Sequence, residues 1–194
     1  MSGNHGSAFA LARAALVALA LAAACPAQAS QEPDEPYVGQ PGKDVIWVPT
    51  PPSLVEKMLD MAAVTPRDYV IDLGSGDGRN VIAAAKRGAS GLGVEFDPQL
   101  VALSRRRAAA EGVAERAQFV EGDMFEADIS RATVLALFLL PDNLAQLKPR
   151  FERLRPGTRI VTNGYQIAGW EPRAVGTAGG DCLPWCTAYL YVVP

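Results

Sequence analysis

The stretch that decides the fold is Val70-Ile71-Asp72-Leu73-Gly74-Ser75-Gly76-Asp77-Gly78. An apolar run, typical of a buried strand, leads into a turn in which every second residue is glycine. A strand, a glycine-rich turn and a following helix begin an open α/β sheet, which binds its ligand at the carboxyl ends of the strands. The dinucleotide fingerprint needs a glycine where Arg79 stands, so the pattern disfavours an NAD-dependent oxidoreductase.

Helix and strand signals alternate on both sides of this turn. Thr50-Pro51 and Asp97-Pro98 each have the form of an N-cap followed by a first-turn proline. The remaining predicted elements are a helix over 80–87, strands over 91–96, 118–120, 133–140 and 159–162, a helix over 142–154 that Pro149 should kink or break, and an antiparallel hairpin within 173–193. We therefore predict an α/β, Rossmann-like, mostly parallel sheet with a C-terminal antiparallel hairpin and helices on both faces.

The first 29 residues are typical of a secretory signal peptide. Arg13 precedes an uncharged apolar run over 14–24, and Ala27-Gln28-Ala29 resembles a cleavage site before Ser30. The run is shorter than the roughly 20 residues of a spanning helix. We expect a signal peptide over 1–29, a linker over 30–36, a domain over 37–194, and a periplasmic or secreted protein, or a cytoplasmic one if the leader is not used. Lipidation of Cys25 would instead anchor the chain to a membrane.

Composition excludes several classes of function. The net charge of −3 and the pI near 5.2 give no strong positive field, so we expect no nucleic-acid partner. The single histidine, His5, lies in the predicted leader, which excludes catalytic triads and histidine metal sites, and we predict no metal. Cys182 and Cys186 could form a disulfide in an oxidising compartment or remain free thiols.

Acidic residues follow the next two predicted strands. Glu95 closes the strand over 91–96, and Asp123 follows the strand over 118–120. A carboxylate at the first of these positions can accept hydrogen bonds from both ribose hydroxyl groups. The pattern favours an adenosyl ligand without a 2′-phosphate.

These residues carry a resemblance to a known family. The stretch 70–78, with Glu95 and Asp123, resembles motif I and the two ligand-binding acids of the class I S-adenosylmethionine (SAM) dependent methyltransferases, and the resemblance covers about 48–193. More narrowly, Trp47-Val48-Pro49-Thr50-Pro51 and Leu139-Leu140-Pro141 resemble bacterial relatives of the ATP synthase c-subunit lysine methyltransferases, which are distantly similar to Dot1-type enzymes.

The resemblance implies SAM as cofactor and assigns roles to residues of this chain. The implied cofactor-binding residues are Thr50, Asp72, Gly74, Ser75, Gly76, Gly78, Glu95, Asp123 and Met124. In this assignment the glycine turn lies against the methionine part of SAM, Glu95 holds the ribose and Asp123 the adenine amino group, while Met124 or Phe125 packs on the adenine. Plainer alternatives stay open: a turn cap for Asp72, a solvated strand end for Glu95, a turn former for Asp123 and a helix cap for Thr50. Arg105-Arg106-Arg107 is interpreted as a solvated helix face or, alternatively, a substrate-docking site.

The resemblance also implies direct transfer of a methyl group to an acceptor, either a protein lysine or a small molecule. Such an in-line displacement needs alignment and exclusion of water, with no metal and no covalent intermediate. The candidate catalytic residues are Asn163 and Tyr165, just after the predicted strand over 159–162, with strand-end hydrogen bonding as their structural alternative. The strand exit Leu140-Pro141-Asp142 lacks the Asn-Pro-Pro-Tyr motif, which disfavours base methylation. The competing hypothesis is an exported binding module that reuses the cofactor cleft, and in either case we expect a monomer.

Overall fold

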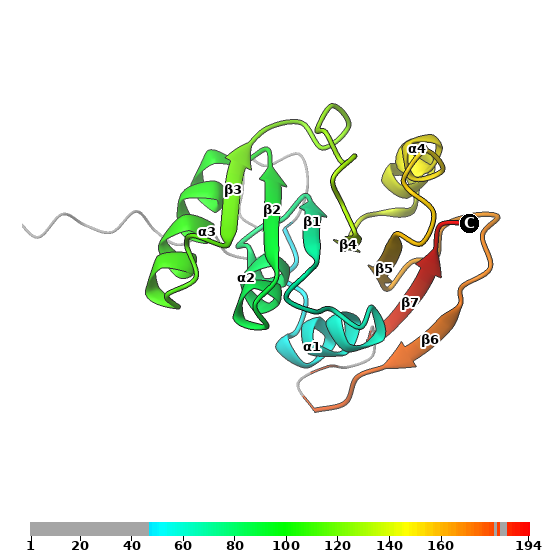
Figure 1. Cartoon of the computed structure of the whole chain (residues 1–194), viewed down its shortest axis with the longest axis horizontal. Coiled ribbons are helices and arrows are strands. Elements are labelled where there is room, and N and C mark those ends of the chain that lie inside the picture. The colour runs from blue at the N-terminus through cyan, green and yellow to red at the C-terminus, as the bar shows by residue number, and fades with distance from the viewer. Residues whose placement is uncertain (1–46, 181, 183–185) are drawn as a thin grey trace, which may run out of the picture. The chain divides into compact units, whose positions relative to one another are not determined.

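The computed structural model describes residues 47–180, 182 and 186–194, all of them in the unit Asp34–Pro194 (Figure 1). The predicted signal peptide, the linker and the predicted start of the domain lie outside the described residues. The helices are α1 (Pro52–Met61), α2 (Arg79–Lys86), α3 (Pro98–Ala110) and α4 (Pro141–Phe151). The strands are β1 (Tyr69–Leu73), β2 (Ser90–Glu95), β3 (Ala117–Glu121), β4 (Val134–Leu137), β5 (Arg159–Asn163), β6 (Ala174–Thr177) and β7 (Thr187–Val192).

The strands form one sheet in the order β3-β2-β1-β4-β5-β7-β6. The first five strands of the chain run parallel, with Asp72 beside Gly93 of β2 and Ile71 beside Leu135 of β4. β7 is antiparallel to both β5 and β6. The predicted mostly parallel sheet with a C-terminal antiparallel hairpin is confirmed, and β1 lies inside it, between β2 and β4.

Successive residues of a strand point to opposite faces, so each face of the sheet builds its own core. On one face, Val70 packs in a cluster with Leu54 and Met58 of α1. On the other, Ile71 packs in a cluster with Leu147 of α4. α2 and α3 pack together on Phe119 of β3 in a third cluster. Helices therefore cover both faces, as predicted.

Two predicted helix features are wrong. α1 begins at Pro52, its N-cap position is Pro51, and no side chain caps it, so Thr50 is not the cap. The predicted end of the helix over 142–154 is also wrong, because α4 continues through Pro149 but ends at Phe151. By contrast, Asp97 caps α3 as expected, with its side chain accepting a hydrogen bond from the Gln99 N–H at 2.9 Å.

The connection between β5 and β6 contains no helix over its described residues 164–173. Trp170 instead packs at an angle against Tyr191, with ring centroids 6.1 Å apart, and the Tyr191 hydroxyl accepts the Ile167 N–H at 3.0 Å. Burial raises the pKa of Tyr191.

A disulfide joins Cys182 to Cys186, whose Cα atoms lie 5.6 Å apart. In the part of the chain described, no helix has the length and apolar character that membrane crossing requires.

Candidate functional site

The turn after β1 has a backbone that suits glycine. Gly74, Gly76 and Gly78 have φ angles of +68°, +55° and +81°, which other residues rarely adopt. A Cβ at Gly76 would collide with the Trp47 indole, and one at Gly78 would come within 2.6 Å of the Phe119 ring. The turn is therefore packed tightly from both sides, and its peptide groups can approach a ligand closely.

Glu95 is fixed beside this turn. Its Oε2 accepts the Gly76 N–H at 2.7 Å, and its Oε1 accepts the Asp97 N–H at 3.0 Å. The side chain is half-buried. Glu95 is thus held against the turn by two backbone N–H groups, and its role in ribose binding stays a prediction.

Asp72 lies under the turn and is buried. Asn80 Nδ2 donates to Asp72 Oδ2 at 3.0 Å and to the Ala136 carbonyl at 3.4 Å, whereas Asp72 Oδ1 has no hydrogen-bond partner. Burial raises the pKa of Asp72 well above its ordinary value, and the negative charges of Glu95 and Asp77 raise it further against the effect of Asn80. A nearby cation would offset this cost of ionisation.

Asp77 is a residue of the turn that sequence reasoning missed. Its side chain is 1% exposed and forms ion pairs with Arg79 and with Arg107 of α3. Arg79 also donates to the Thr50 carbonyl. Asp77 therefore fixes the turn to α3 and, through Arg79, to the segment before α1; the Asp-x-Arg spacing is the one local signal that could have indicated this.

Thr50 and Asn163 lie together at the carboxyl end of the sheet. Asn163 Nδ2 donates to Thr50 Oγ1 at 3.3 Å, while Asn163 Oδ1 is buried without a partner. Asn163 is the last residue of β5, not the residue after it as predicted. The Tyr165 side chain, beyond the strand, is 38% exposed. The structure brings the candidate catalytic Asn163 to Thr50, the residue that the resemblance placed over the cofactor.

The residues after β3 have local contacts of their own. Asp123 is exposed, and its Oδ1 accepts the Phe125 N–H at 2.8 Å, which is the turn-forming contact named as its alternative role. Met124 and Phe125 pack partly buried against the cluster that includes α4. The adenine contacts of Asp123 and Met124 stay predictions.

Arg105 is exposed and the Arg107 side chain is 38% exposed, which agrees with the interpretation of Arg105-Arg106-Arg107 as a solvated helix face, but both side chains also have partners within the fold. Arg105 donates to the Phe119 carbonyl at 2.7 Å, and Arg107 pairs with Asp77. These contacts join α3 to β3 and to the glycine turn, because the long side chains reach back over the strand that α3 covers.

Unpartnered buried polar atoms gather around the turn. Of the five such side-chain atoms in the part of the chain that the structure describes, four are Asp72 Oδ1, Ser75 Oγ, Asn80 Oδ1 and Asn163 Oδ1. Buried polar atoms normally have a partner, either protein, water or ligand, so this cluster suits the polar groups of a bound ligand. The glycine turn and the Glu95 and Asp72 carboxylates suit a ligand with a ribose and a positive charge, and SAM fits the residues present. No group of residues suited to a metal occurs within the described ranges.

A family comparison covers the site. The sequence profile of the ANTKMT methyltransferase domain matches residues 72–174, from the buried aspartate to the first residue of β6. A protein-lysine N-methyltransferase from Saccharolobus islandicus is 41% identical over 152 residues, which are 77% of this chain and 94% of that protein.

Two further comparisons are informative. The human lysine N-methyltransferase of the ATP synthase c-subunit is 35% identical over 138 residues, and the match spans 71% of this chain but 59% of the human protein. A crystal structure of an RNA methyltransferase from Salinibacter ruber, in complex with S-adenosyl-L-homocysteine, has a TM-score of 0.71 and 44% sequence identity, covering 76% of this chain and 94% of that one. The names of these similar proteins agree on methyl transfer and differ on the acceptor.

Proposed function

Because the chain belongs to the ANTKMT methyltransferase domain family, we propose that it methylates the ε-amine of a protein lysine. SAM-dependent methyl transfer is the activity of the chain, and the acceptor is the part that we propose. Two relatives named above, one archaeal and one human, are lysine N-methyltransferases. The RNA methyltransferase supplies the competing acceptor.

The charge at the exits of β3 and β4 favours a lysine. Glu121, Asp123 and Glu126 follow one another at the end of β3, and Asp142 lies in the first turn of α4; all four are exposed. Carboxylates attract the lysine ammonium group and repel the phosphates of RNA. We therefore place the approach of the acceptor along this edge.

The observation that carries the proposal is the unpartnered Asn163 Oδ1 at the end of β5. An amide oxygen accepts a hydrogen bond from a neutral amine and so fixes the direction of its lone pair. Thr50 holds the other end of the amide through Asn163 Nδ2, at 3.3 Å. Asn163 would thus orient the lysine nitrogen, and the exposed Tyr165 would line its entrance.

The methyl transfer needs few other groups from the protein. When bound, SAM supplies an activated methyl group on a positively charged sulfur. The lysine must first lose its proton to solvent, after which the new N–C bond forms as the C–S bond breaks. The chain contributes alignment through Asn163, and Trp47 and the buried turn exclude water.

Intact-mass measurement tests the acceptor. The full chain is incubated with SAM and the purified c-ring of ATP synthase, and in parallel with total RNA that is digested to nucleosides. We expect increments of about 14 Da per methyl group on a lysine of the protein and none on RNA. Asn163→Ala should lower kcat roughly a hundredfold while leaving SAM affinity within about twofold.

Tyr165→Phe is the matched control, because it keeps the ring that lines the entrance. Methylated nucleosides without protein methylation would contradict the lysine acceptor. SAM binding with no transfer to protein, RNA or small amines would favour the binding-module alternative.

We also propose export of the chain, a proposal that rests on the sequence of residues 1–29 alone. Fractionation of cells that express the chain with and without these residues tests it. Recovery of both forms in the cytoplasm would contradict the signal peptide.

A further inference from the structure

A polar hollow lies at the opposite end of the sheet from the glycine turn. It has a volume of about 460 Å³, and its lining includes Tyr69 and Ser90, the first residues of β1 and β2, and Arg116, just before β3. The hollow includes Tyr69 at the start of β1, and the turn begins at Gly74 after its end, so the two lie roughly 15 Å apart at the rise of a strand. The hollow is therefore separate from the site described above.

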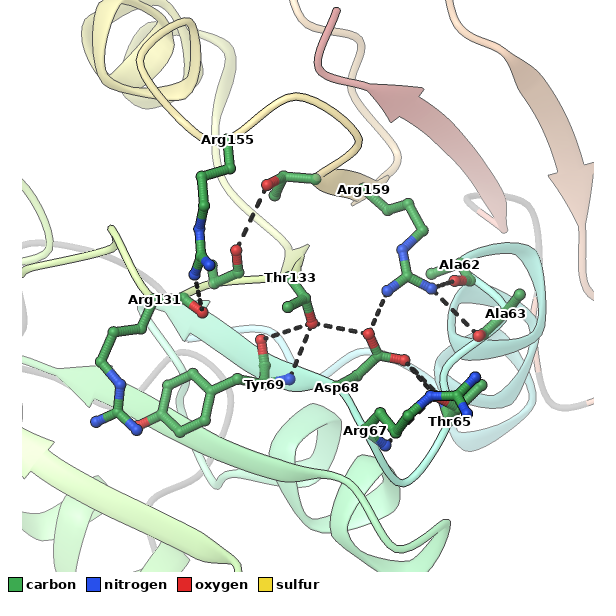
Figure 2. Close-up of polar contacts among 12 residues, drawn as sticks. Ala62, Ala63, Thr65, Arg67, Asp68, Tyr69, Arg131, Thr133, Arg155 and Arg159 are labelled. Atoms are coloured by element: carbon green, nitrogen blue, oxygen red, sulfur yellow. Dashed lines mark hydrogen bonds and ion pairs between the residues drawn. The ribbon is translucent and has the colours of Figure 1, made fainter.

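Three arginines surround the hollow: Arg67, Arg116 and Arg131. The acidic residues in its lining are Asp68 and Glu115. Asp68 is already paired with Arg159, which approaches from β5 (Figure 2). The hollow thus has an excess of positive charge in a chain whose net charge is −3.

These three guanidinium groups differ from those of several other arginines in their ion pairing with carboxylates. None of the three forms an ion pair with any residue in the described ranges, whereas Arg87, Arg107 and Arg159 each do. Arg67, which is exposed, makes no side-chain hydrogen bond in those ranges.

The second observation is that Arg131 is held in place without an ion pair in the described ranges, although it interacts electrostatically with the exposed carboxylate of Asp128. Its guanidinium lies over the Tyr69 ring, 4.5 Å from the centroid, and Figure 2 shows the two side chains extending together. Stacking on an aromatic ring fixes the direction of a guanidinium and leaves its N–H groups free to donate. The half-buried Ser90 also lines the hollow.

From this geometry we propose that the hollow binds a phosphate-sized dianion, either free phosphate or a phosphate monoester. Guanidinium forks match the oxygens of such a group and donate paired, charge-assisted hydrogen bonds to it. Asp68, which would repel the anion, is compensated by Arg159, so Glu115 is the one acidic group left at the rim. The site is independent of the methyl acceptor.

Calorimetry on the full chain tests the proposal with inorganic phosphate as the probe, at constant ionic strength balanced with chloride. We expect saturable binding of one phosphate. Arg67→Gln should weaken it about tenfold and Arg67→Gln/Arg131→Gln about a hundredfold, which corresponds to the loss of one and two charge-assisted bonds. Phenyl phosphate as a second probe distinguishes the sources: tighter binding than inorganic phosphate identifies a monoester, and equal binding identifies free phosphate.

Arg153→Gln is the matched control, because Arg153 is exposed just after α4 and lies outside the hollow. Its phosphate affinity should equal that of the wild type. SAM affinity, measured in the same samples, should be unchanged in every variant and shows that each is folded. Absence of saturable phosphate binding by the wild type, or equal affinity in the double variant, would overturn the proposal.

Discussion

Buried aspartates at the two ends of the sheet differ in how completely their carboxylates are hydrogen-bonded. At the amino end, Asp68 is fully engaged: Thr65 donates to one carboxylate oxygen, and Thr133 and Arg159 donate to the other (Figure 2). At the carboxyl end, Asp72 keeps one oxygen without a partner. A completed network holds elements together, and an incomplete one marks the place of a ligand. The two aspartates are only four residues apart in the chain, yet Asp68 stabilises the fold and Asp72 belongs to the candidate functional site.

The largest expected effect breaks the amino-end network. Asp68→Asn should lower the free energy of unfolding by about 3 kcal/mol at neutral pH, because it leaves Arg159 without its buried partner. Urea denaturation measures this, and the SAM affinity of the folded variant should not change. Asp60→Asn is the control: Asp60 pairs with Arg87 but is 67% exposed, so its loss should cost under about 1 kcal/mol.

The stability difference between the wild type and Asp68→Asn should depend on pH. Burial raises the pKa of Asp68, but the hydrogen bonds from Thr65, Thr133 and Arg159 outweigh it and lower that pKa below its ordinary 3.8. The stabilisation is therefore complete above the ordinary pKa and is lost as pH falls through the lower folded value. The gap between wild type and Asp68→Asn should shrink below about pH 4. A gap that grows in acid would contradict the assignment.

A smaller effect is expected at the carboxyl end of the sheet, where a substitution should weaken ligand binding. Glu95→Gln should weaken SAM binding about a hundredfold, since the amide cannot accept both ribose hydroxyl groups as the carboxylate can. The free energy of unfolding should fall by about 1–2 kcal/mol, because the amide can accept only one of the two backbone N–H groups that the carboxylate accepts. Glu121→Gln is the matched control, because Glu121 lies beside Glu95 in the register of β2 and β3 and is exposed. Equal SAM affinity in the two variants would disprove the role of Glu95.

The smallest effect concerns Asp72, whose pKa is raised mainly by burial. The positive charge of SAM favours the ionised carboxylate, so SAM affinity should rise about tenfold as pH increases through the raised pKa. Asp72→Asn should remove this dependence. S-adenosylhomocysteine, which lacks the sulfonium charge, should show a weaker dependence in the wild type. Titration calorimetry across pH measures all three, and an unchanged slope in the variant would show that Asp72 does not face the cofactor.

Features set by neighbouring residues could be predicted from the sequence. The glycine turn and the Asp97 cap both depend on local backbone conformation, and both occur where predicted. The wrong helix start at Thr50 has a long-range cause, because the Thr50 hydroxyl is engaged by Asn163, 113 residues away. Sequence spacing carries no information on such a contact.

The remaining differences have the same origin. The role of Asp77 depends on its ion pair with Arg107, which lies 30 residues further along the chain. The predicted fourth strand over 133–140 is too long because Leu139 packs in the core without strand pairing, while Leu140 is exposed. Burial and strand pairing both select apolar residues, so hydrophobicity alone cannot separate them.

The position of β7 has a consequence for how the protein is made. This strand, Thr187–Val192, comes last in the chain yet lies between β5 and β6 in the sheet. While the ribosome is still extending the chain, the open side of β5 presents unpaired backbone groups, a surface on which other chains can add. Because β7 lies between β5 and β6, β6 can join the sheet only after β7 has been synthesised, so this side of the sheet assembles out of chain order.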